Sequence, residues 1–337
     1  MTPALVSLSR RAAAALVLPV VLSLAAALPA RAGSLDPVTD RAVVLPQEPA
    51  VPDVGRRQRL GIAFSMTNDF FGDRHDRWRT GSMMMSYVRG PAWDGTAPAG
   101  FGDLIEFRLM SQVIAPVDLI TPNPTDRPYA GAISLGVHTH MERRGIEMAL
   151  GADLVVIGPQ TGISSLHDDL HELFGSTRPS SAMLAGQIAD TIRPTLVAEV
   201  GRSFDLGPSA RLRPFVEARA GDETLLRLGA DLIFGPAGRG ELLVRDPVTG
   251  QRSRVVANAE PGFSFLLGAD IAYVADSVYL PSSRGYTLSD HRDRLRAGLY
   301  WQGRRTGLFF GMTYLGEEFT AQPESQVVGT LQLKVTF

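Results

Sequence analysis

Past residue 58 the sequence alternates apolar residues with small or polar ones, in segments of about ten residues. Ile133, Leu135 and Val137 alternate with small or polar neighbours, and the same pattern runs from Leu308 to Tyr314. A period of two predicts β-strands that have one apolar face. Strands of soluble proteins average ~5–6 residues, whereas outer-membrane barrels are built from alternating segments of ~10 residues. The segment length therefore favours strands that cross a membrane.

The alternation predicts twelve strands, an even number, as a single-chain bacterial barrel requires. We expect them near residues 59–68, 80–89, 103–113, 129–140, 145–157, 191–204, 210–220, 224–234, 262–275, 291–302, 305–315 and 326–337. The connection over residues 235–261 is too long for a simple turn, and we expect it to contain part of a strand.

Two architectures use strands with one apolar face. In a soluble sandwich the apolar face points inward, and in an outer-membrane barrel it points outward to lipid while polar residues face the lumen. The polar positions carry many charges: Glu106, Arg108, Glu147, Asp153, Glu199, Arg227, Asp231 and Asp270. The last residues, 331–337, alternate and end in Phe337, which resembles the recognition signal of bacterial outer-membrane barrels, although an ordinary last strand also ends this way. We therefore predict an all-β fold, a transmembrane antiparallel β-barrel of about twelve strands with a short helix in an extracellular loop, as a single domain over residues 58–337.

The N-terminus has the features of a secretory signal peptide. Arg10 and Arg11 precede an apolar run over residues 12–28, and an Ala-Arg-Ala cleavage pattern ends at Ala32. This order predicts a signal peptide over residues 1–32, with an uncleaved anchor helix as the alternative. Residues 33–57 hold four prolines and no periodic pattern, so we expect a disordered leader.

Composition excludes several classes of site. The chain has no cysteine, which rules out disulfides, Cys-ligated zinc and iron–sulfur clusters. Removing residues 1–32 takes away three arginines and leaves 30 basic against 35 acidic residues, a formal net charge of −5. We expect no nucleic-acid partner. Secretion without cysteine is compatible with a bacterial envelope, where disulfides are optional.

Three connections carry the unusual residues. If both termini are periplasmic, residues 69–79, 114–128 and 158–190 form the first three extracellular loops. The third is predicted to contain a helix with His167 and His171, which share one helix face because they are four residues apart. A helix in a barrel loop suggests a function.

Taken singly, these signals have simpler interpretations. Asn68-Asp69 at a strand end is typical of a turn, and Asp126-Arg127 is compatible with a local ion pair. The His-Asp-x-x-His sequence at His167 resembles the zinc-peptidase His-Glu-x-x-His motif, but the shorter Asp would place the base poorly.

His138 and His140 share lumen parity, and we expect them to bond to neighbouring strands rather than to pair on a metal. The chain has no serine nucleophile elbow, no P-loop and no dinucleotide fingerprint.

As an ordered set, the loop motifs are more specific. They are Asn68-Asp69, then Asp76-Arg77 with Thr80-Gly81, then Thr121-Pro122 with Asp126-Arg127-Pro128-Tyr129-Ala130-Gly131, then Val156-Ile157-Gly158-Pro159, and finally His171 four residues before Gly175. In this order the chain resembles the outer-membrane lipid A 3′-O-deacylases, the LpxR family, over nearly all of the mature sequence. The resemblance implies a twelve-stranded barrel that hydrolyses the ester-linked 3′ acyloxyacyl group of lipid A and requires Ca²⁺.

The resemblance also implies roles for individual residues. His171 would be the general base that activates water, Asp69 would supply a carboxylate to Ca²⁺, and Asn68 would position the ion or the substrate. The chemistry agrees, because ester hydrolysis needs a base with a pKa near neutrality and an electrophile for the developing oxyanion. Ca²⁺ prefers hard oxygen ligands such as Asp, Asn and backbone carbonyls.

Lipid A is a bis-phosphorylated glycolipid, and arginine binds phosphate bidentately. Arginines in or beside the loops are Arg74, Arg77, Arg79, Arg127 and Arg178. We predict that Arg77, Arg79 and Arg127, together with Tyr129, bind the substrate. A generic solvated rim is the alternative.

One stretch departs from the family pattern. The family commonly has Tyr-Thr-x-Gly at the start of the second strand, with a Thr hydroxyl in the site, whereas this chain reads Trp78-Arg79-Thr80-Gly81. The position aligned with that hydroxyl is Arg79, and Thr80 would face the opposite way in a regular strand. A bulge would bring Thr80 into the site. His167 stands where the family has a neutral polar residue, which suggests a supporting group or a metal ligand particular to this branch.

Two functions are compatible with these observations. The first is a Ca²⁺-assisted outer-membrane esterase acting on lipid A in the outer leaflet, with its active site facing the cell surface. The second is a non-catalytic barrel of the same fold, either a small channel or a structural protein. Convergence of Asn68, Asp69 and His171 at one rim would favour the first function, and His171 pointing away from Asp69 would exclude it.

Overall fold

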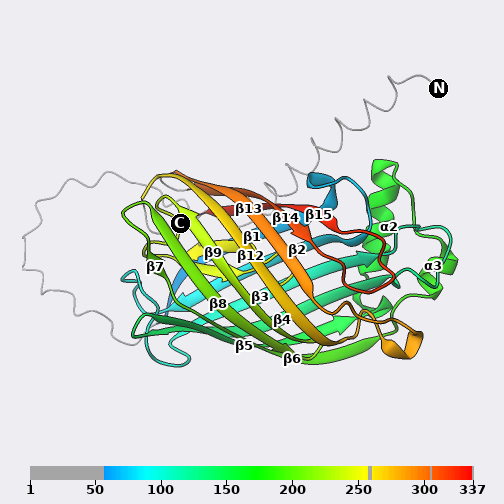
Figure 1. Cartoon of the computed structure of the whole chain (residues 1–337), viewed down its shortest axis with the longest axis horizontal. Helices are drawn as coiled ribbons and strands as arrows, with labels where there is room; N and C mark the ends of the chain where they lie inside the picture. The colour runs from blue at the N-terminus through cyan, green and yellow to red at the C-terminus, as the bar shows by residue number, and fades with distance from the viewer. Residues whose placement is uncertain (1–56, 257–259, 304–305, 336–337) are drawn as a thin grey trace, which may run out of the picture.

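Twelve strands form a closed antiparallel barrel (Figure 1). The computed structural model describes residues 57–256, 260–303 and 306–335, so the expected signal peptide, the leader up to residue 56 and Phe337 lie outside the described residues. The wall is formed, in chain order, by β1 (Gln58–Asn68), β2 (Trp78–Gly90), β3 (Leu104–Ala115), β4 (Ala130–Arg143), β5 (Ile146–Ile157), β6 (Thr191–Gly201), β8 (Ala210–Ala220), β9 (Glu223–Phe234), β12 (Gly262–Ser277), β13 (Arg292–Gln302), β14 (Thr306–Leu315) and β15 (Gln326–Val335). Pairing of β1 with β15 closes the wall, and each predicted strand is confirmed to within a few residues. A short strand, β7 (Phe204–Asp205), extends the turn before β8.

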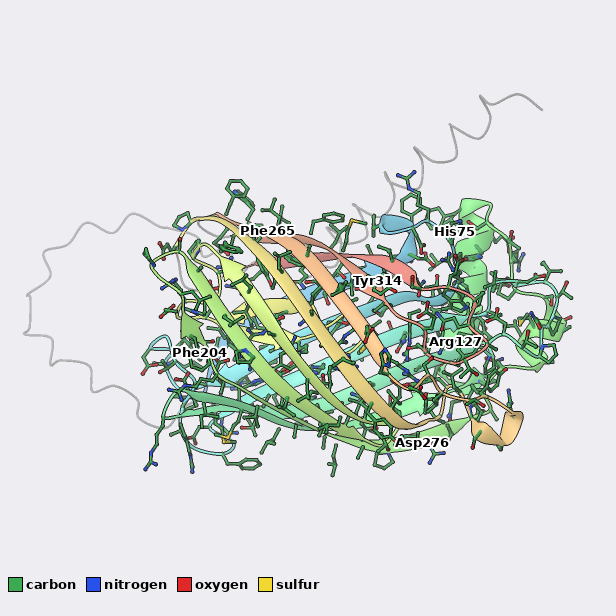
Figure 2. All side chains as sticks on the ribbon, in the orientation of Figure 1. His75, Arg127, Phe204, Phe265, Asp276 and Tyr314 are labelled. Atoms are coloured by element: carbon green, nitrogen blue, oxygen red, sulfur yellow. The ribbon has the colours of Figure 1, made fainter. Side chains whose placement is uncertain are left out.

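The side-chain distribution is that of a membrane barrel rather than a soluble sandwich. Leu196 is 66% exposed and Tyr273 is 65% exposed on the outer face, whereas the lumen residue Asp231 is 1% exposed. Figure 2 labels two further exposed apolar residues of the wall, Phe265 and Tyr314. Apolar residues outside and charged residues inside is the arrangement that lipid imposes on a barrel. No helix among the described residues is long and apolar enough to cross a membrane.

Paired charges fill much of the lumen. Arg296 contacts both Asp231 and Asp270, and Arg294 lies 2.8 Å from Asp270. His138 lies 2.8 Å from Asp153 on β5, and His140 lies 2.8 Å from Glu106 on β3. The prediction that the two histidines bond to neighbouring strands is therefore confirmed. Because each of these buried charges has an opposite partner, the desolvation of these groups is compensated within the protein.

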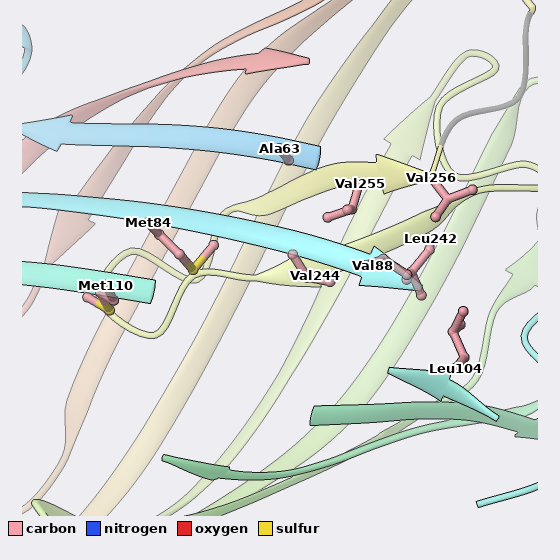
Figure 3. Packing of buried hydrophobic residues seen from close by; sticks show 9 residues of the cluster. All are labelled: Ala63, Met84, Val88, Leu104, Met110, Leu242, Val244, Val255 and Val256. Atoms are coloured by element: carbon pink, nitrogen blue, oxygen red, sulfur yellow. The ribbon is translucent and has the colours of Figure 1, made fainter. Parts of the chain in front are cut away.

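The described residues of the connection 235–261 do not belong to the wall, and the strand that we expected there is not a wall strand. The connection forms a separate hairpin of β10 (Leu242–Arg245) and β11 (Arg252–Val256), whose residues are all buried. The hairpin enters the lumen and packs its valines and Leu242 against lumen-facing residues of β1, β2 and β3, among them Ala63 and Val88 (Figure 3). Gly61 makes this approach possible, since a Cβ there would lie 1.9 Å from the carbonyl oxygen of Val255.

The hairpin also contacts the far side of the wall. Arg245 lies 2.7 Å from Glu199 on β6 and 2.9 Å from Asp231 on β9, and Gln251 donates to backbone carbonyls of β13 and β14. Arg294 in turn donates to the carbonyl of Pro247 in the hairpin turn. The hairpin therefore bridges the lumen from wall to wall. The alternation of apolar and polar residues did not predict this hairpin. Both faces of its strands are buried, so neither face is marked as the apolar one.

The helices gather at one end of the barrel, which we call the helix rim (Figure 1). It carries η1 (Asp69–Phe71), η2 (Pro159–Thr161), α2 (Ile163–Phe174), α3 (Ser181–Ala185) and η3 (Ser282–Arg284). The predicted helix with His167 and His171 is confirmed as α2. The three loops expected to share one rim do so, and the lumen hairpin enters from the opposite end.

Candidate active site

The first part of the site is built where β1 ends. The side-chain oxygen of Asn68 accepts a hydrogen bond from the N–H of Phe70 (2.8 Å) and so begins the short helix η1. η1 packs directly against β15. The two elements are so close that a Cβ atom at Gly72 would clash with Val327, and one at Gly329 would clash with Phe71. This close packing buries Asp69, whose Oδ2 accepts the N–H of Arg77 (3.2 Å).

The second part is a bulge in β2. The register with β3 runs from Trp78 opposite Ala115 to Gly81 opposite Val113, so β2 has one extra residue at this point. The bulge places both Arg79 and Thr80 in buried positions. It turns Thr80 toward the first loop, and the Thr80 hydroxyl donates to Oδ1 of Asp76 (2.5 Å). Trp78 adopts a positive φ of 52°, which is consistent with a distorted strand start.

The third part is α2, which lies over the mouth of the barrel. Its first residue, Ile163, packs so closely on β4 that a Cβ at Gly131 would lie 2.6 Å away. Its end is set by Gly175 in the left-handed region (φ 66°). Between these points the helix directs His167 and His171 toward the loop after η1, and the two rings lie 4.1 Å apart.

Contacts hold each imidazole in place. Nδ1 of His171 lies 2.5 Å from the carbonyl oxygen of Thr177, which can only accept, so Nδ1 carries a proton. Nε2 of His171 lies 3.1 Å from Oδ2 of Asp76. His167 uses Nδ1 for the hydroxyl of Tyr129 (3.1 Å), a fully buried side chain. A chain of contacts therefore runs from Thr80 through Asp76 to His171.

Electrostatics differ between Asp76 and His171. Burial alone would raise the pKa of Asp76, but hydrogen bonds with His171 and Thr80 outweigh burial and lower it. Burial alone would lower the pKa of His171, but the hydrogen bond with Asp76, the Thr177 carbonyl and the charge of Asp69 raise it. Asp76 therefore stays ionised and stabilises the protonated form of His171, which is the form that a general base takes once it has accepted a proton.

Two other groups are held in their uncharged forms more readily than usual. Burial, followed by the negative charge of Asp76, raises the pKa of Asp69 to about 7. Burial, followed by the neighbouring His171, lowers the pKa of His167 to about 4. Shifts of this size in one cluster are typical of functional sites.

The environment of Asp69 fits a hard cation. Among the described residues no arginine or lysine forms an ion pair with Asp69, although Asp73 and Asp76 lie near enough to raise its pKa. A buried carboxylate that lacks a positive partner is costly, and a bound divalent cation would remove that cost. Asn68 retains a free lone pair on its amide oxygen, so oxygen donors of the type that Ca²⁺ prefers are available.

The predicted substrate-binding residues are largely committed inside the protein. Arg79 contacts Glu223 and Glu318, and the fully buried Arg127 lies 2.5 Å from Glu318. Figure 2 labels Arg127 at the helix rim. Arg77 contacts Asp73 and Glu324, and Tyr129 is bonded to His167. These side chains would have to exchange partners to bind a phosphate, so their role as substrate ligands stays a prediction.

Asp76 is the residue that sequence reasoning missed. It belongs to the Asp76-Arg77 segment of the first loop, but nothing in its local sequence indicates a contact with a helix about 95 residues later. The spacing of four residues to Thr80 was the available signal, since both lie at the entry to β2.

The fold and the site together define an outer-membrane β-barrel that carries a buried polar cluster with a histidine and carboxylates at one rim. The family described as outer membrane protein LpxR matches residues 18–337. The chain belongs to this family, as its loop motifs suggested. No curated protein matches the sequence.

Solved structures agree on the fold. LpxR from Salmonella typhimurium is 16% identical, with a TM-score of 0.69 over 82% of this chain and 100% of that chain. The KdgM porin is 6% identical, with a TM-score of 0.38 over 82% of this chain and 99% of that chain, which is too distant a likeness to bear on function. The Salmonella protein thus confirms the closed twelve-stranded fold.

Proposed function

We propose that the chain is a Ca²⁺-assisted outer-membrane esterase that hydrolyses the 3′-linked acyloxyacyl chain of lipid A. The observation that carries the proposal is the contact between Nε2 of His171 and Asp76, which is held by Thr80 and lies beside Asp69. Membership of the LpxR family supports lipid A as the substrate, because the lipid A deacylases that the loop motifs resemble are the proteins of that family.

The proposed proton transfers use one ring nitrogen of His171. With Nδ1–H of His171 bonded to the Thr177 carbonyl, Nε2 would accept a proton from the attacking water, once that water takes the place of the Asp76 carboxylate at this nitrogen. Asp76 stabilises the resulting imidazolium. The hydroxide adds to the ester carbonyl, the bond to the sugar oxygen breaks, and His171 returns its proton to that leaving oxygen. The products are a free acid and a sugar hydroxyl, and the histidine is regenerated.

Asp69 and Asn68 are the residues that would hold Ca²⁺ in this proposal. When bound, the cation would supply positive charge for the carbonyl oxygen as it becomes an oxyanion. Asp69 is oriented for this role by the N–H of Arg77, and Asn68 by its contact with Phe70. Thr80 keeps Asp76 engaged with His171, so that the base and the cation ligands stay separate groups.

We place the helix rim on the cell surface. Bacterial barrels have short periplasmic turns and longer external loops. The connection between β5 and β6 on the helix rim covers residues 158–190, whereas the turn between β4 and β5 at the opposite end is Arg144 and Gly145 alone. The site would then lie at the level of the outer leaflet, where lipid A resides.

A non-catalytic barrel is the alternative, and the lumen hairpin argues against its channel form. The decisive experiment is mass spectrometry of lipid A from cells that express the wild type, His171→Ala or the matched control His75→Ala, with and without calcium chelation. His75 is an exposed histidine of the first loop. We expect loss of the 3′ acyl chains with the wild type and the control, and no loss with His171→Ala or after chelation. An identical lipid A profile for all proteins would overturn the proposal.

A further inference from the structure

A second metal-binding arrangement lies next to the proposed calcium ligands. One carboxylate oxygen of Asp76 and one ring nitrogen each of His167 and His171 all lie within 4.8 Å of one another. The three come from two separate segments, the first loop and α2, which the fold brings together. His167 and Asp76 are at least partly buried, so the cluster is not a chance grouping of solvated side chains.

Each of the three groups is oriented by a further contact. Nδ1 of His171 is bonded to the Thr177 carbonyl, and Nδ1 of His167 lies 3.1 Å from the Tyr129 hydroxyl. The other oxygen of Asp76 accepts from Thr80. Histidines that bind metals typically direct their second nitrogen to such an acceptor, and carboxylate ligands are likewise hydrogen-bonded. Nε2 is therefore the ring nitrogen left for a metal in both histidines, and in His171 it already lies 3.1 Å from the carboxylate of Asp76, the third member of the cluster.

The donor set selects the class of ion. Two imidazoles and one carboxylate suit a borderline divalent ion such as Zn²⁺ or Co²⁺, whereas Ca²⁺ takes oxygen ligands. Three protein ligands leave one coordination position open for water or another small ligand. His167 supplies the second imidazole of the cluster, and without it the donor set would be one imidazole and one carboxylate.

We propose that Asp76, His167 and His171 form a binding site for one divalent transition-metal ion. A consequence rests on the proposed function. The ion would occupy Nε2 of His171, the nitrogen that accepts the proton of the attacking water, so the bound metal inhibits the esterase. Ca²⁺ at Asn68 and Asp69 would not compete directly, since the two sites share no ligand.

The test uses Co²⁺ as a spectroscopic probe of the purified full chain in detergent micelles, in excess Ca²⁺. The wild type is expected to bind one Co²⁺ with visible absorption bands of a low-coordinate site, and Zn²⁺ is expected to displace it. His167→Gln should weaken Co²⁺ binding by at least about tenfold, the loss that removal of even a supporting contact causes. His75→Gln serves as the matched control and should bind as the wild type does.

Tyr129→Phe provides a second variant that leaves all three ligands in place. It removes the hydroxyl that contacts His167 Nδ1, and we expect an intermediate loss of Co²⁺ affinity. Heat-modifiable migration in electrophoresis verifies that each variant is a folded barrel. Absence of stoichiometric Co²⁺ binding by the wild type, or equal binding by folded His167→Gln, would overturn the metal site.

Inhibition is measured separately, as the Zn²⁺ concentration that halves the deacylation rate of each protein relative to its own metal-free rate. His167→Gln is expected to need at least about tenfold more Zn²⁺ than the wild type. Equal sensitivity of the two proteins would contradict the inhibitory role. A chain that binds Co²⁺ but never deacylates lipid A would refute the proposed function and leave the metal site standing.

Discussion

The lumen around the hairpin and the Asp69 site at the helix rim treat buried charge in opposite ways. Toward the hairpin end, Arg296 is shared between Asp231 and Asp270, and Arg245 is shared between Glu199 and Asp231. At the helix rim, Asp69 is buried without an ion pair to arginine or lysine among the described residues. Compensated charge fills and rigidifies a lumen, whereas uncompensated charge attracts a cation or a proton. The difference separates the part of the molecule that maintains the fold from the part that can do chemistry.

Removing the hairpin should have the largest effect on this contrast. Replacing residues 242–256 by a short Gly-Ser linker takes away the element that bridges the lumen, and leaves wall charges such as Glu199 facing water. We expect the wild type to be closed and the deletion variant to conduct ions in planar lipid bilayers. A folded deletion variant that stays closed would show that the wall charges alone block the lumen.

Asp76→Asn should reveal the chemistry of the helix rim. The amide keeps the shape but loses the charge that stabilises protonated His171, so we expect kcat/KM for lipid A deacylation to fall by about 10²–10⁴-fold. Resistance to denaturant should change little, because the rim loop lies outside the wall. Asp168→Asn is the matched control, since Asp168 lies on α2 but contacts Arg178 rather than the site.

Arg296→Met tests the other end. It leaves Asp231 and Asp270 short of a buried partner, and breaking such a pair costs about 3–5 kcal/mol. We expect a lower midpoint in urea-induced unfolding from lipid vesicles, with activity per folded molecule close to that of the wild type. A large loss of activity at unchanged stability would mean that the two ends are coupled.

Thr80→Val should have the smallest effect of the four. It removes the hydroxyl that bonds Oδ1 of Asp76 and leaves a partly buried acceptor unpaired, a cost of about 1–3 kcal/mol. Thr80→Ser keeps the hydroxyl and should restore most of the activity. Equal rates for the Val and Ser variants would show that the bulge in β2 serves packing alone.

Most of the wall strands could be predicted from local sequence patterns. Strand bounds such as those of β8 and β12 follow from period-two alternation, which depends only on neighbouring residues. The helix that carries His167 and His171 was likewise predicted from its own local sequence, which ends at Gly175. For Thr80 the sequence left two outcomes open, a regular strand that turns the hydroxyl away from the site or a bulge that brings it in, and the structure has the bulge.

Other features required the tertiary structure. Residues 235–261 have no local signal that separates a wall strand from a hairpin inside the lumen, because both bury apolar residues. The partner of His171 also escaped prediction, since Asp76 reaches it only when α2 packs across the barrel mouth on Gly131. The pairing of Arg79 and Arg127 with Glu223 and Glu318 likewise joins residues more than a hundred positions apart.

The sequence by itself therefore determined the class of fold, the family and the residues that gather at one rim. Alternation and ordered motifs are one-dimensional, and they suffice for those conclusions. Only the tertiary structure decided which buried charges have an oppositely charged partner and which have none and can bind a ligand. Burial and pairing are properties of three-dimensional neighbours, and in this protein they leave Asp69, Asp76 and the two histidines of α2 as the groups available for chemistry.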